Sequence, residues 1–265
     1  MKIGIFDSGL GGLWTMKSIV KELPDYDYVY LGDTKRLPYG NRSHETVYEF
    51  LCEGLTYLLK EKDCKIVVVA CNTASAEAVS RARREFLPKK FPDRYVFGMI
   101  LPTAEEAVQF RRVGIIATRG TISSNVYPKV IKKLNPKTKV FQLATPLLVP
   151  LIENDGSTFI TEAVRDYLKP FATKKIDALV LGCTHYPIIK RTIRKFLPKN
   201  VAIISQDEFI PDRILLWLAD HPSVETGLSK NKKREFLVTD ITPHFKKLAK
   251  VWFGKNLKLT KVSLG

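Results

Sequence analysis

Val67-Val68-Val69-Ala70-Cys71-Asn72-Thr73 is the stretch of this 265-residue chain that decides its fold. It ends a nearly continuous Val/Ile run over residues 65–70, and such runs are typical of parallel strands buried on both faces. Leu179-Val180-Leu181-Gly182-Cys183-Thr184-His185 repeats the pattern. Each stretch has an apolar strand, a small residue, a cysteine and hydrogen-bonding residues that enter a helix. The repeat indicates two similar α/β halves, each presenting one thiol at the end of a strand.

Outward from this stretch, apolar strand patterns alternate with helical patterns. We expect strands over residues 2–6, 27–31, 65–70, 95–100, 113–117, 139–143, 178–181, 201–205 and 235–238. We expect helices over residues 13–23, 43–62 (with Ser43 as N-cap), 121–134, 158–173, 187–196, 207–219 and 243–253, and one that follows Cys71 and ends at residue 84. This alternation predicts parallel sheets covered by helices on both faces. In such sheets the chemistry gathers at the carboxyl ends of the strands.

The composition is that of an ordinary globular protein, with 45% hydrophobic and 26% charged residues. No apolar run approaches the roughly 18–20 residues that a membrane span needs. The start, MKIGIFDSGLGG, does not have the pattern of a signal peptide, because an acid and glycines follow a very short apolar stretch. We therefore expect a cytoplasmic protein without membrane association.

The formal net charge is +16, which permits binding to nucleic acid or to an anionic substrate. The basic residues are scattered, and the densest groups, 230–234 and 246–250, have the patterns of a loop and a helix face. No zinc-finger spacing, helix-turn-helix pattern or RNA-binding aromatic signature accompanies them. We therefore do not expect a nucleic-acid partner. A steep dependence of DNA affinity on salt, without enzymatic activity, would favour that alternative.

The chain has four cysteines and no CxxC pair, so the sequence gives little support for a zinc site or another metal centre. Disulfides are not expected in a reducing cytosol. Cys52 falls inside a predicted helix and Cys64 just before a strand, and both have the pattern of small packing residues. Cys71 and Cys183 differ, because each follows a strand and precedes a predicted helix N-terminus. That position favours the thiolate, so we expect a lowered pKa.

Two thiols that face one cleft suit proton transfer on both faces of a carbon. In a racemisation one base removes the α-proton and its partner returns a proton to the opposite face. One thiol must then start as thiolate and the other as thiol. An α-proton is far less acidic than a thiol, and a gap of even ten pKa units would cost ~14 kcal/mol. Preorganised hydrogen-bond donors and a closed, water-poor cleft must offset that cost.

The motif Asp7-Ser8-Gly9-Leu10-Gly11-Gly12 follows the first strand and enters a helix. Its order is G-x-G-G rather than G-x-G-x-x-G, so a dinucleotide site is only weakly supported. Asp7 and Ser8 could instead meet the ammonium and carboxylate of a substrate. The alternative for Asp7 is a carboxylate that only caps the next helix.

Other polar residues have weaker contexts. The dipeptide Tyr39-Gly40 has the pattern of a turn. His185 directly follows Cys183 and Thr184, where it could orient or protonate the thiol. Glu153 ends an amphipathic stretch over 146–153 and by itself has the pattern of a surface acid. His44, His221 and His244 have no comparable context.

Five motifs, in this order, resemble those of the glutamate racemases of the aspartate/glutamate racemase superfamily. They are residues 4–12 (GIFDSGLGG), 32–40 (GDTKRLPYG), 70–75 (ACNTAS), 144–153 (ATPLLVPLIE) and 181–187 (LGCTHYP). The resemblance implies two pseudo-symmetric α/β domains with the active site in the cleft between them. The second domain, residues 98–206, would be inserted into the first, residues 1–97 plus 207–265. The tail after residue 224 matches poorly, and Trp14 and Leu101 depart from residues that are usual in the family.

The resemblance also implies the roles of individual residues. Cys71 and Cys183 would be the acid/base thiols, with Asp7 assisting Cys71, and Glu153 and His185 assisting Cys183. The substrate, glutamate, would be held by Asp7, Ser8, Tyr39, Gly40, Asn72, Thr73, Thr184 and His185. Neither pyridoxal phosphate nor a metal would be needed. The enzyme would be a homodimer, and its product, D-glutamate, would feed peptidoglycan synthesis and so cell-wall biogenesis and cell shape.

Two relatives within the superfamily are alternatives. An aspartate racemase would differ in pocket size, although residues 71–75 and 183–187 are closer to the glutamate branch. A decarboxylase or another isomerase often replaces one cysteine or its neighbours, whereas both cysteines are present here.

Overall fold

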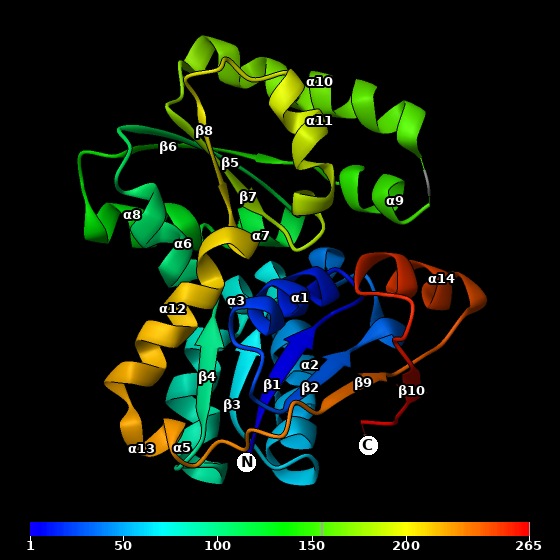
Figure 1. Cartoon of the computed structure of the whole chain (residues 1–265). Coiled ribbons are helices and arrows are strands. Elements are labelled where there is room, and N and C mark those ends of the chain that lie inside the picture. The colour runs from blue at the N-terminus through cyan, green and yellow to red at the C-terminus, as the bar shows by residue number, and fades with distance from the viewer. Residues whose placement is uncertain (155, 265) are drawn as a thin grey trace.

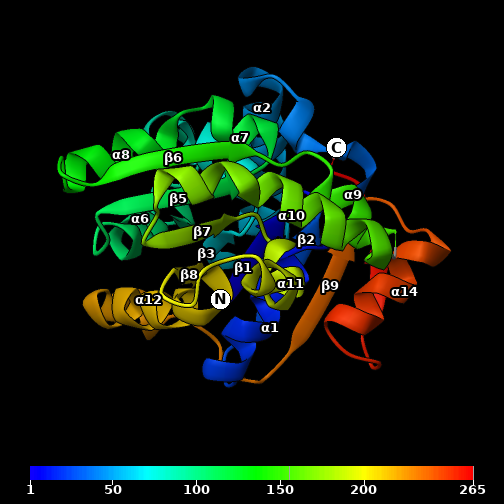
Figure 2. The same cartoon turned by 90° about the horizontal axis from the view of Figure 1, so that it is seen from above.

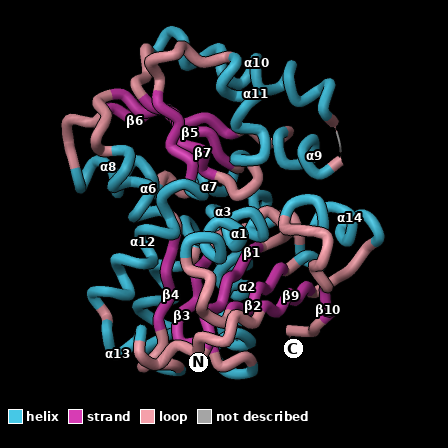
Figure 3. Tube along the Cα trace, in the orientation of Figure 1, coloured by secondary structure: helices cyan, strands magenta, loops and turns pink. Residues whose placement is uncertain are grey.

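Two parallel β-sheets form the core of the computed structural model, which describes residues 1–154 and 156–264 (Figures 1 and 3). The strand order is β10-β9-β2-β1-β3-β4 in the larger sheet and β6-β5-β7-β8 in the smaller. The strands are β1 (Lys2–Asp7), β2 (Tyr28–Gly32), β3 (Cys64–Val69), β4 (Tyr95–Gly98), β5 (Arg112–Ala117), β6 (Lys139–Ala144), β7 (Ala178–Gly182), β8 (Ala202–Ser205), β9 (Arg234–Val238) and β10 (Leu259–Lys261). All strand pairs are parallel, which confirms the predicted fold class.

Helices cover the sheets, as the alternating sequence pattern predicts (Figure 2). They are α1 (Gly12–Glu22), α2 (His44–Thr56), α3 (Asn72–Glu77), α4 (Val79–Arg81), α5 (Leu87–Lys90), α6 (Ile100–Ala107), α7 (Arg119–Ser123), α8 (Val126–Leu134), α9 (Leu148–Glu153), α10 (Ser157–Lys174), α11 (Lys190–Lys195), α12 (Gln206–Asp220), α13 (Pro222–Glu225) and α14 (Pro243–Trp252). Short 3₁₀ turns lie at Thr34–Arg36, Tyr39–Asn41 and Tyr186–Ile189, and π-helical turns at Tyr57–Glu61 and Ala82–Phe86. Among the described helices, none is both long and apolar enough to cross a membrane.

Local sequence explains the best-predicted elements. The Val/Ile run of β3 and the run Ala-Leu-Val-Leu-Gly of β7 are buried almost throughout, as expected for central parallel strands. Ser43 caps α2, because its side chain accepts the N–H of Thr46, and this confirms the predicted N-cap.

Five predicted elements differ from the structure in extent or type. The helix expected over 187–196 begins as the 3₁₀ turn Tyr186–Ile189, and the one expected over 43–62 continues after Thr56 as a π-helical turn. The strand expected over 95–100 ends at Gly98, because Ile100 already begins α6. The helix expected over 121–134 is broken at Asn125, whose left-handed φ of 54° separates α7 from α8. The helix expected from Cys71 to residue 84 is interrupted at Ala78, where φ is −130°, outside the helical range. The sequence pattern also did not predict β10.

The chain leaves the larger sheet after β4 and returns to it at β9. In Figure 1, helix α12 runs from the smaller sheet down beside the larger one, and both termini lie at the far end of the larger sheet. Thus strands within residues 2–98 and 234–261 build one sheet, and strands within 112–205 build the other. The domain bounds 1–97 plus 207–265 and 98–206 stay a prediction.

The carboxyl ends of the two sheets meet. Thr184, just after β7, donates a hydrogen bond from Oγ1 to Oδ2 of Asp7 at the end of β1, over 3.3 Å. Polar residues at the ends of strands from both sheets therefore share one site.

Candidate active site

A cavity of about 320 Å³ lies where the ends of the two sheets meet. Of the predicted site residues, those that line it are Ser8, Tyr39, Gly40, Cys71, Asn72, Thr73, Glu153, Cys183, Thr184 and His185. Asp7 lies behind this lining and is almost fully buried. The structure therefore brings all the predicted site residues together, and both thiols border the same space.

Cys71 follows β3 and is the N-cap of α3. Its Sγ accepts the N–H of Ala74 over 3.5 Å and lies 3.3 Å from Oγ of Ser8. Burial and, to a smaller extent, the carboxylate of Asp7 raise the pKa of Cys71 to about 12, against the effect of the hydrogen bonds from Ala74 and Ser8. The expected lowering of this pKa is wrong, because desolvation outweighs the helix N-terminus. Cys71 therefore holds its proton at neutral pH.

Asp7 contacts groups from both halves of the site. Its Oδ1 accepts the N–H of Gly9 over 2.8 Å, and its Oδ2 accepts the hydroxyl of Thr184. Burial raises the pKa of Asp7, while the charge of His185 and the backbone amides of Gly9 and Gly12 oppose that shift. Since Gly12 begins α1, Asp7 supports this helix as well as the site.

Cys183 directly follows β7, and its Sγ lies 3.8 Å from Nδ1 of His185. On the other side of the ring, Nε2 of His185 lies 2.8 Å from Oε1 of Glu153. Burial opposes charge on the ring, but the contacts with Cys183 and Glu153 raise the pKa of His185 to about 10. His185 is therefore an imidazolium at neutral pH. Trp252 of α14 packs edge-on against this ring, with centroids 5.4 Å apart.

The two thiols are not held in equivalent ways. Cys71 caps an α-helix, whereas Cys183 is separated from the 3₁₀ turn at Tyr186–Ile189 by two residues. The sequence repeat is therefore confirmed for strand and thiol but not for the following helix. Cys71 lies near the carboxylate of Asp7, whereas Cys183 lies beside the cationic ring of His185, so the two sulfur atoms have opposite electrostatic surroundings.

Gly11 and Gly12 allow the close approach on which the site depends. A Cβ on Gly11 would lie 2.4 Å from Oγ1 of Thr184 and 2.5 Å from Nδ1 of His185. A Cβ on Gly12 would lie 2.5 Å from Cβ of Asp7. The glycines of the first motif thus let its backbone pack against the Cys183 loop, rather than cradle a phosphate.

Two predicted substrate-binding residues have their side chains engaged elsewhere. The hydroxyl of Tyr39 donates to Oδ2 of Asp33 over 2.5 Å, so its polar atom is held away from the cavity. Burial and the neighbouring carboxylate raise the pKa of Tyr39 well above its ordinary value. The side-chain amide of Asn72 is bonded to Gln206 and Tyr127. Both residues can still present backbone groups to a substrate.

Several cavity residues were missed by sequence reasoning. Thr118 caps α7 and lies 2.9 Å, oxygen to oxygen, from Thr73. Thr145 lies within the motif at 144–153, which was the available signal. Arg119 is exposed, lines the cavity and has no hydrogen-bond or ionic partner among the described residues.

His244 lies outside the cavity lining but contacts a residue of the site. No sequence signal pointed to it, and its Nε2 lies 2.7 Å from the backbone oxygen of Glu153.

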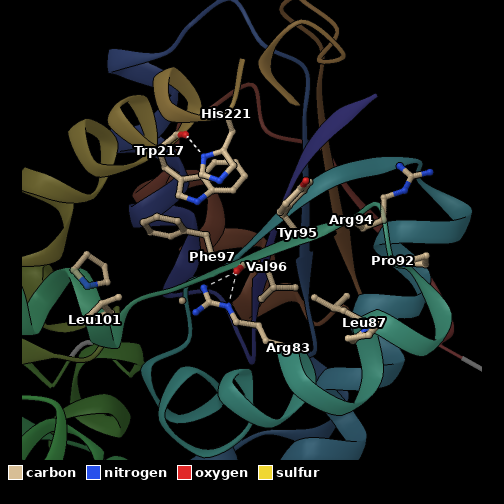
Figure 4. Close-up of a pocket in the computed structure, with 13 residues that line it drawn as sticks. Arg83, Leu87, Pro92, Arg94, Tyr95, Val96, Phe97, Leu101, Trp217 and His221 are labelled. Carbon is tan, nitrogen blue, oxygen red and sulfur yellow. Dashed lines mark hydrogen bonds between the residues drawn. The ribbon is translucent and has the colours of Figure 1, made fainter. Parts of the chain in front are cut away.

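A second cavity, of about 480 Å³, lies beside β4 (Figure 4). The ring of His221 stacks on Trp217 at 4.0 Å, and Arg83 donates two hydrogen bonds to the backbone oxygen of Val96. Leu101 also borders this cavity. None of the predicted site residues lines it, so the functional site is assigned by its chemistry and not by its volume.

The described residues contain no group of three or more His, Cys, Asp or Glu side chains placed to hold a metal ion. The fold and the cavity define an α/β enzyme with its site between the ends of two parallel sheets. Comparison with known proteins identifies the family.

The model of the Asp/Glu/Hydantoin racemase family matches residues 12–206. A glutamate racemase of Microcystis aeruginosa is 37% identical over 99% of this chain and 91% of its own length. One from Aquifex aeolicus is 46% identical over 74% of this chain and 76% of its own length. The crystal structure of glutamate racemase from Francisella tularensis in complex with D-glutamate has a TM-score of 0.89 and 34% identity, with 99% of this chain and 97% of that chain covered.

The chain therefore belongs to the Asp/Glu/Hydantoin racemase family, on the branch of the glutamate racemases, and is an isomerase.

Proposed function

We propose that this enzyme interconverts L- and D-glutamate by proton transfer between the α-carbon and the thiols of Cys71 and Cys183. The observation that carries the proposal is that one thiol from each half of the fold borders the same cavity. Glutamate as substrate is supported by the names of the relatives, one of which is described in complex with D-glutamate.

In one direction, the thiolate of Cys183 removes the α-proton and the thiol of Cys71 gives its proton to the opposite face. The contacts described above support this start, because His185 provides a positive charge beside Cys183 and burial keeps the proton on Cys71. The reaction leaves Cys183 as thiol and Cys71 as thiolate, which is the starting state for the reverse direction. Both directions thus use the same two groups with their roles exchanged.

The helper residues act on the thiols by charge and position. Glu153 holds His185 charged, and His185 in turn stabilises negative charge on Cys183. Asp7, held by Gly9 and Thr184, lies close enough to Cys71 to influence its pKa. We propose that Asp7 orients the substrate ammonium group. We also propose that the negative charge of Asp7 helps Cys71 to keep its proton until Cys71 protonates the α-carbon.

Substrate recognition is assigned to polar groups around the cavity. The hydroxyls of Ser8 and Thr73 and the backbone of Tyr39, Gly40, Asn72 and Thr184 supply hydrogen bonds for the two carboxylates. Asn72 and Thr73 begin α3, where backbone N–H groups have no carbonyl partner in the helix. Arg119 is a cation at the cavity lining that can attract the anionic substrate.

We further propose that the reaction needs neither pyridoxal phosphate nor a metal, and that the enzyme acts in the cytoplasm as a homodimer. Its D-glutamate would enter peptidoglycan synthesis and so support cell-wall biogenesis and cell shape. These assignments rest on the family resemblance. Growth of a bacterium that requires D-glutamate, restored by this gene alone, would test the cellular role, and sedimentation would test the dimer.

The activity itself is tested with purified protein in heavy water, with a reducing agent and no added cofactor. L-Glutamate and L-aspartate are incubated separately, and optical rotation is followed together with loss of the α-proton signal. We expect rapid change with L-glutamate and little with L-aspartate. The reverse preference would indicate an aspartate racemase. No change in optical rotation or in the α-proton signal with either substrate would refute the racemase proposal.

A further inference from the structure

The side chain of Asn72, the residue after Cys71, is held by a reciprocal amide pair. Its Nδ2 donates to Oε1 of Gln206 over 2.7 Å, and Nε2 of Gln206 donates back to its Oδ1 over 2.9 Å. The hydroxyl of Tyr127 donates to the same Oδ1 over 2.8 Å. All three side chains are at most 2% exposed. Because buried amides are costly to leave unpaired, this cluster has a strong preference for one arrangement.

The partners of Asn72 come from the other half of the fold. Gln206 is the first residue of α12, directly after β8 of the smaller sheet, and Tyr127 belongs to α8. Gln206 also donates to Oγ1 of Thr103 in α6, over 2.9 Å. Asn72 itself begins α3, which follows β3 of the larger sheet. The cluster therefore joins the turn that carries Cys71 to the smaller sheet and its helices.

A second contact joins the start of α12 to α1, the helix that follows the first strand of the larger sheet. Asp207, next to Gln206, accepts the indole N–H of Trp14 in α1 over 3.0 Å, and its other oxygen accepts the hydroxyl of Ser205 over 2.5 Å. The start of α12 is thus bonded to α1 through Asp207 and to α3 through Gln206. Trp14 does not line the thiol cavity, so it packs at this joint rather than at the mouth of the site.

We propose that Gln206 is a positioning residue that, through Asn72, fixes Cys71 against the half of the fold that carries Cys183. The proposal rests on the two-thiol function given above. Adjacent Cα atoms are about 3.8 Å apart across a rigid peptide plane, so a shift of Asn72 moves Cys71 with it. Gln206 does not line the cavity. Gln206 thus sets the distance between the two thiols that face the α-carbon of the substrate from opposite sides.

Gln206→Leu tests this role, because leucine has a similar size but cannot bond to Asn72. We expect kcat to fall by about 10- to 100-fold, the usual effect of a small displacement of a reacting group. The telling measurement is the ratio of α-proton exchange to inversion in heavy water, taken with each enantiomer. When Cys71 is displaced, Cys183 still removes the α-proton from the enantiomer that it deprotonates in the wild type. Inversion is slow, because Cys71 is poorly placed to protonate the opposite face. The ratio should therefore rise with one enantiomer only.

The controls separate positioning from stability. Gln109→Leu removes an exposed glutamine and should change neither kcat nor the ratio. If Gln206→Leu does not fold, Tyr127→Phe, which removes one hydrogen bond to Asn72, should give the same one-sided rise of about two- to tenfold. An unchanged kcat, or an equal loss of exchange and inversion with both enantiomers, would overturn the proposal. Inactive wild-type protein would instead refute the proposed function.

Discussion

Nε2 of the buried His185 ring lies 2.8 Å from Oε1 of Glu153, which is only 17% exposed. In the sequence, His185 was only a histidine near a cysteine, and Glu153 was only an acid at the end of an amphipathic stretch. In the structure the two form a pair that places a positive charge beside Cys183. Because the pKa of His185 is raised to about 10, the ring stays charged throughout the neutral range. At neutral pH Cys183 therefore lies beside a cation, and Cys71 does not.

Replacing Cys71 or Cys183 with Ala should reduce racemisation by at least about 10³-fold, because each variant removes one of the two proton carriers. The rate is measured by optical rotation with each enantiomer. Cys52→Ala is the matched control, since Cys52 is a half-buried cysteine of α2 that does not line the cavity. It should keep its activity. Turnover retained in either active-site variant would rule out the two-thiol scheme.

Replacing Glu153 with Gln should lower stability at acid and neutral pH by about 2 kcal/mol, because the charged acceptor of the buried His185 ring becomes a neutral amide oxygen. In the native protein the pKa of His185 is raised from 6.5 to about 10. The stabilisation is therefore complete below pH 6.5 and is lost as the pH rises towards 10. Urea unfolding of both proteins across this range measures it. A stability difference that did not shrink with rising pH would contradict the charged pair.

Replacing Gly11 with Ala should disrupt the site from the backbone side. The added Cβ would meet Thr184 and His185 at 2.4–2.6 Å, so these groups must move. We expect a loss of about 1–3 kcal/mol in the free energy of unfolding, together with a large fall in kcat. Gly227→Ala is the control, because its Cβ would have no neighbour closer than 3.5 Å. Normal kcat in Gly11→Ala would show that this contact is not needed.

Replacing Arg119 with Ala should raise KM for glutamate by about 5- to 20-fold, the loss expected for a charge-assisted contact, with kcat nearly unchanged. The guanidinium has no ionic partner among the described residues, so its charge is available to the substrate. Steady-state rates at low and high salt measure the effect. Arg119→Lys should retain most of the affinity. A KM that is equally sensitive to salt in the wild type and in Arg119→Ala would contradict this role.

Much of the fold was predictable because its central strands carry a local signal. The Val/Ile run before Cys71 and the apolar run before Cys183 both become buried parallel strands. The break at Asn125 was not predictable in the same way, because the residues on either side continue a helical pattern. Short edge strands such as β10 have too few residues to show a period.

The sequence by itself determined the two parallel sheets and the placing of a thiol at the end of a strand in each. It did so because burial on both faces and turns rich in small residues are local properties of the chain. The set of residues around the thiols was implied by the family resemblance of the motifs and not by a local pattern. Only the tertiary structure decided which thiol lies beside a cation, since Glu153 and His185 are 32 positions apart. It also raised the pKa of Cys71 instead of lowering it, and it joined Gln206 to Asn72 across 134 positions. Desolvation and long-range pairing depend on what packs around a group, and no local pattern contains that information.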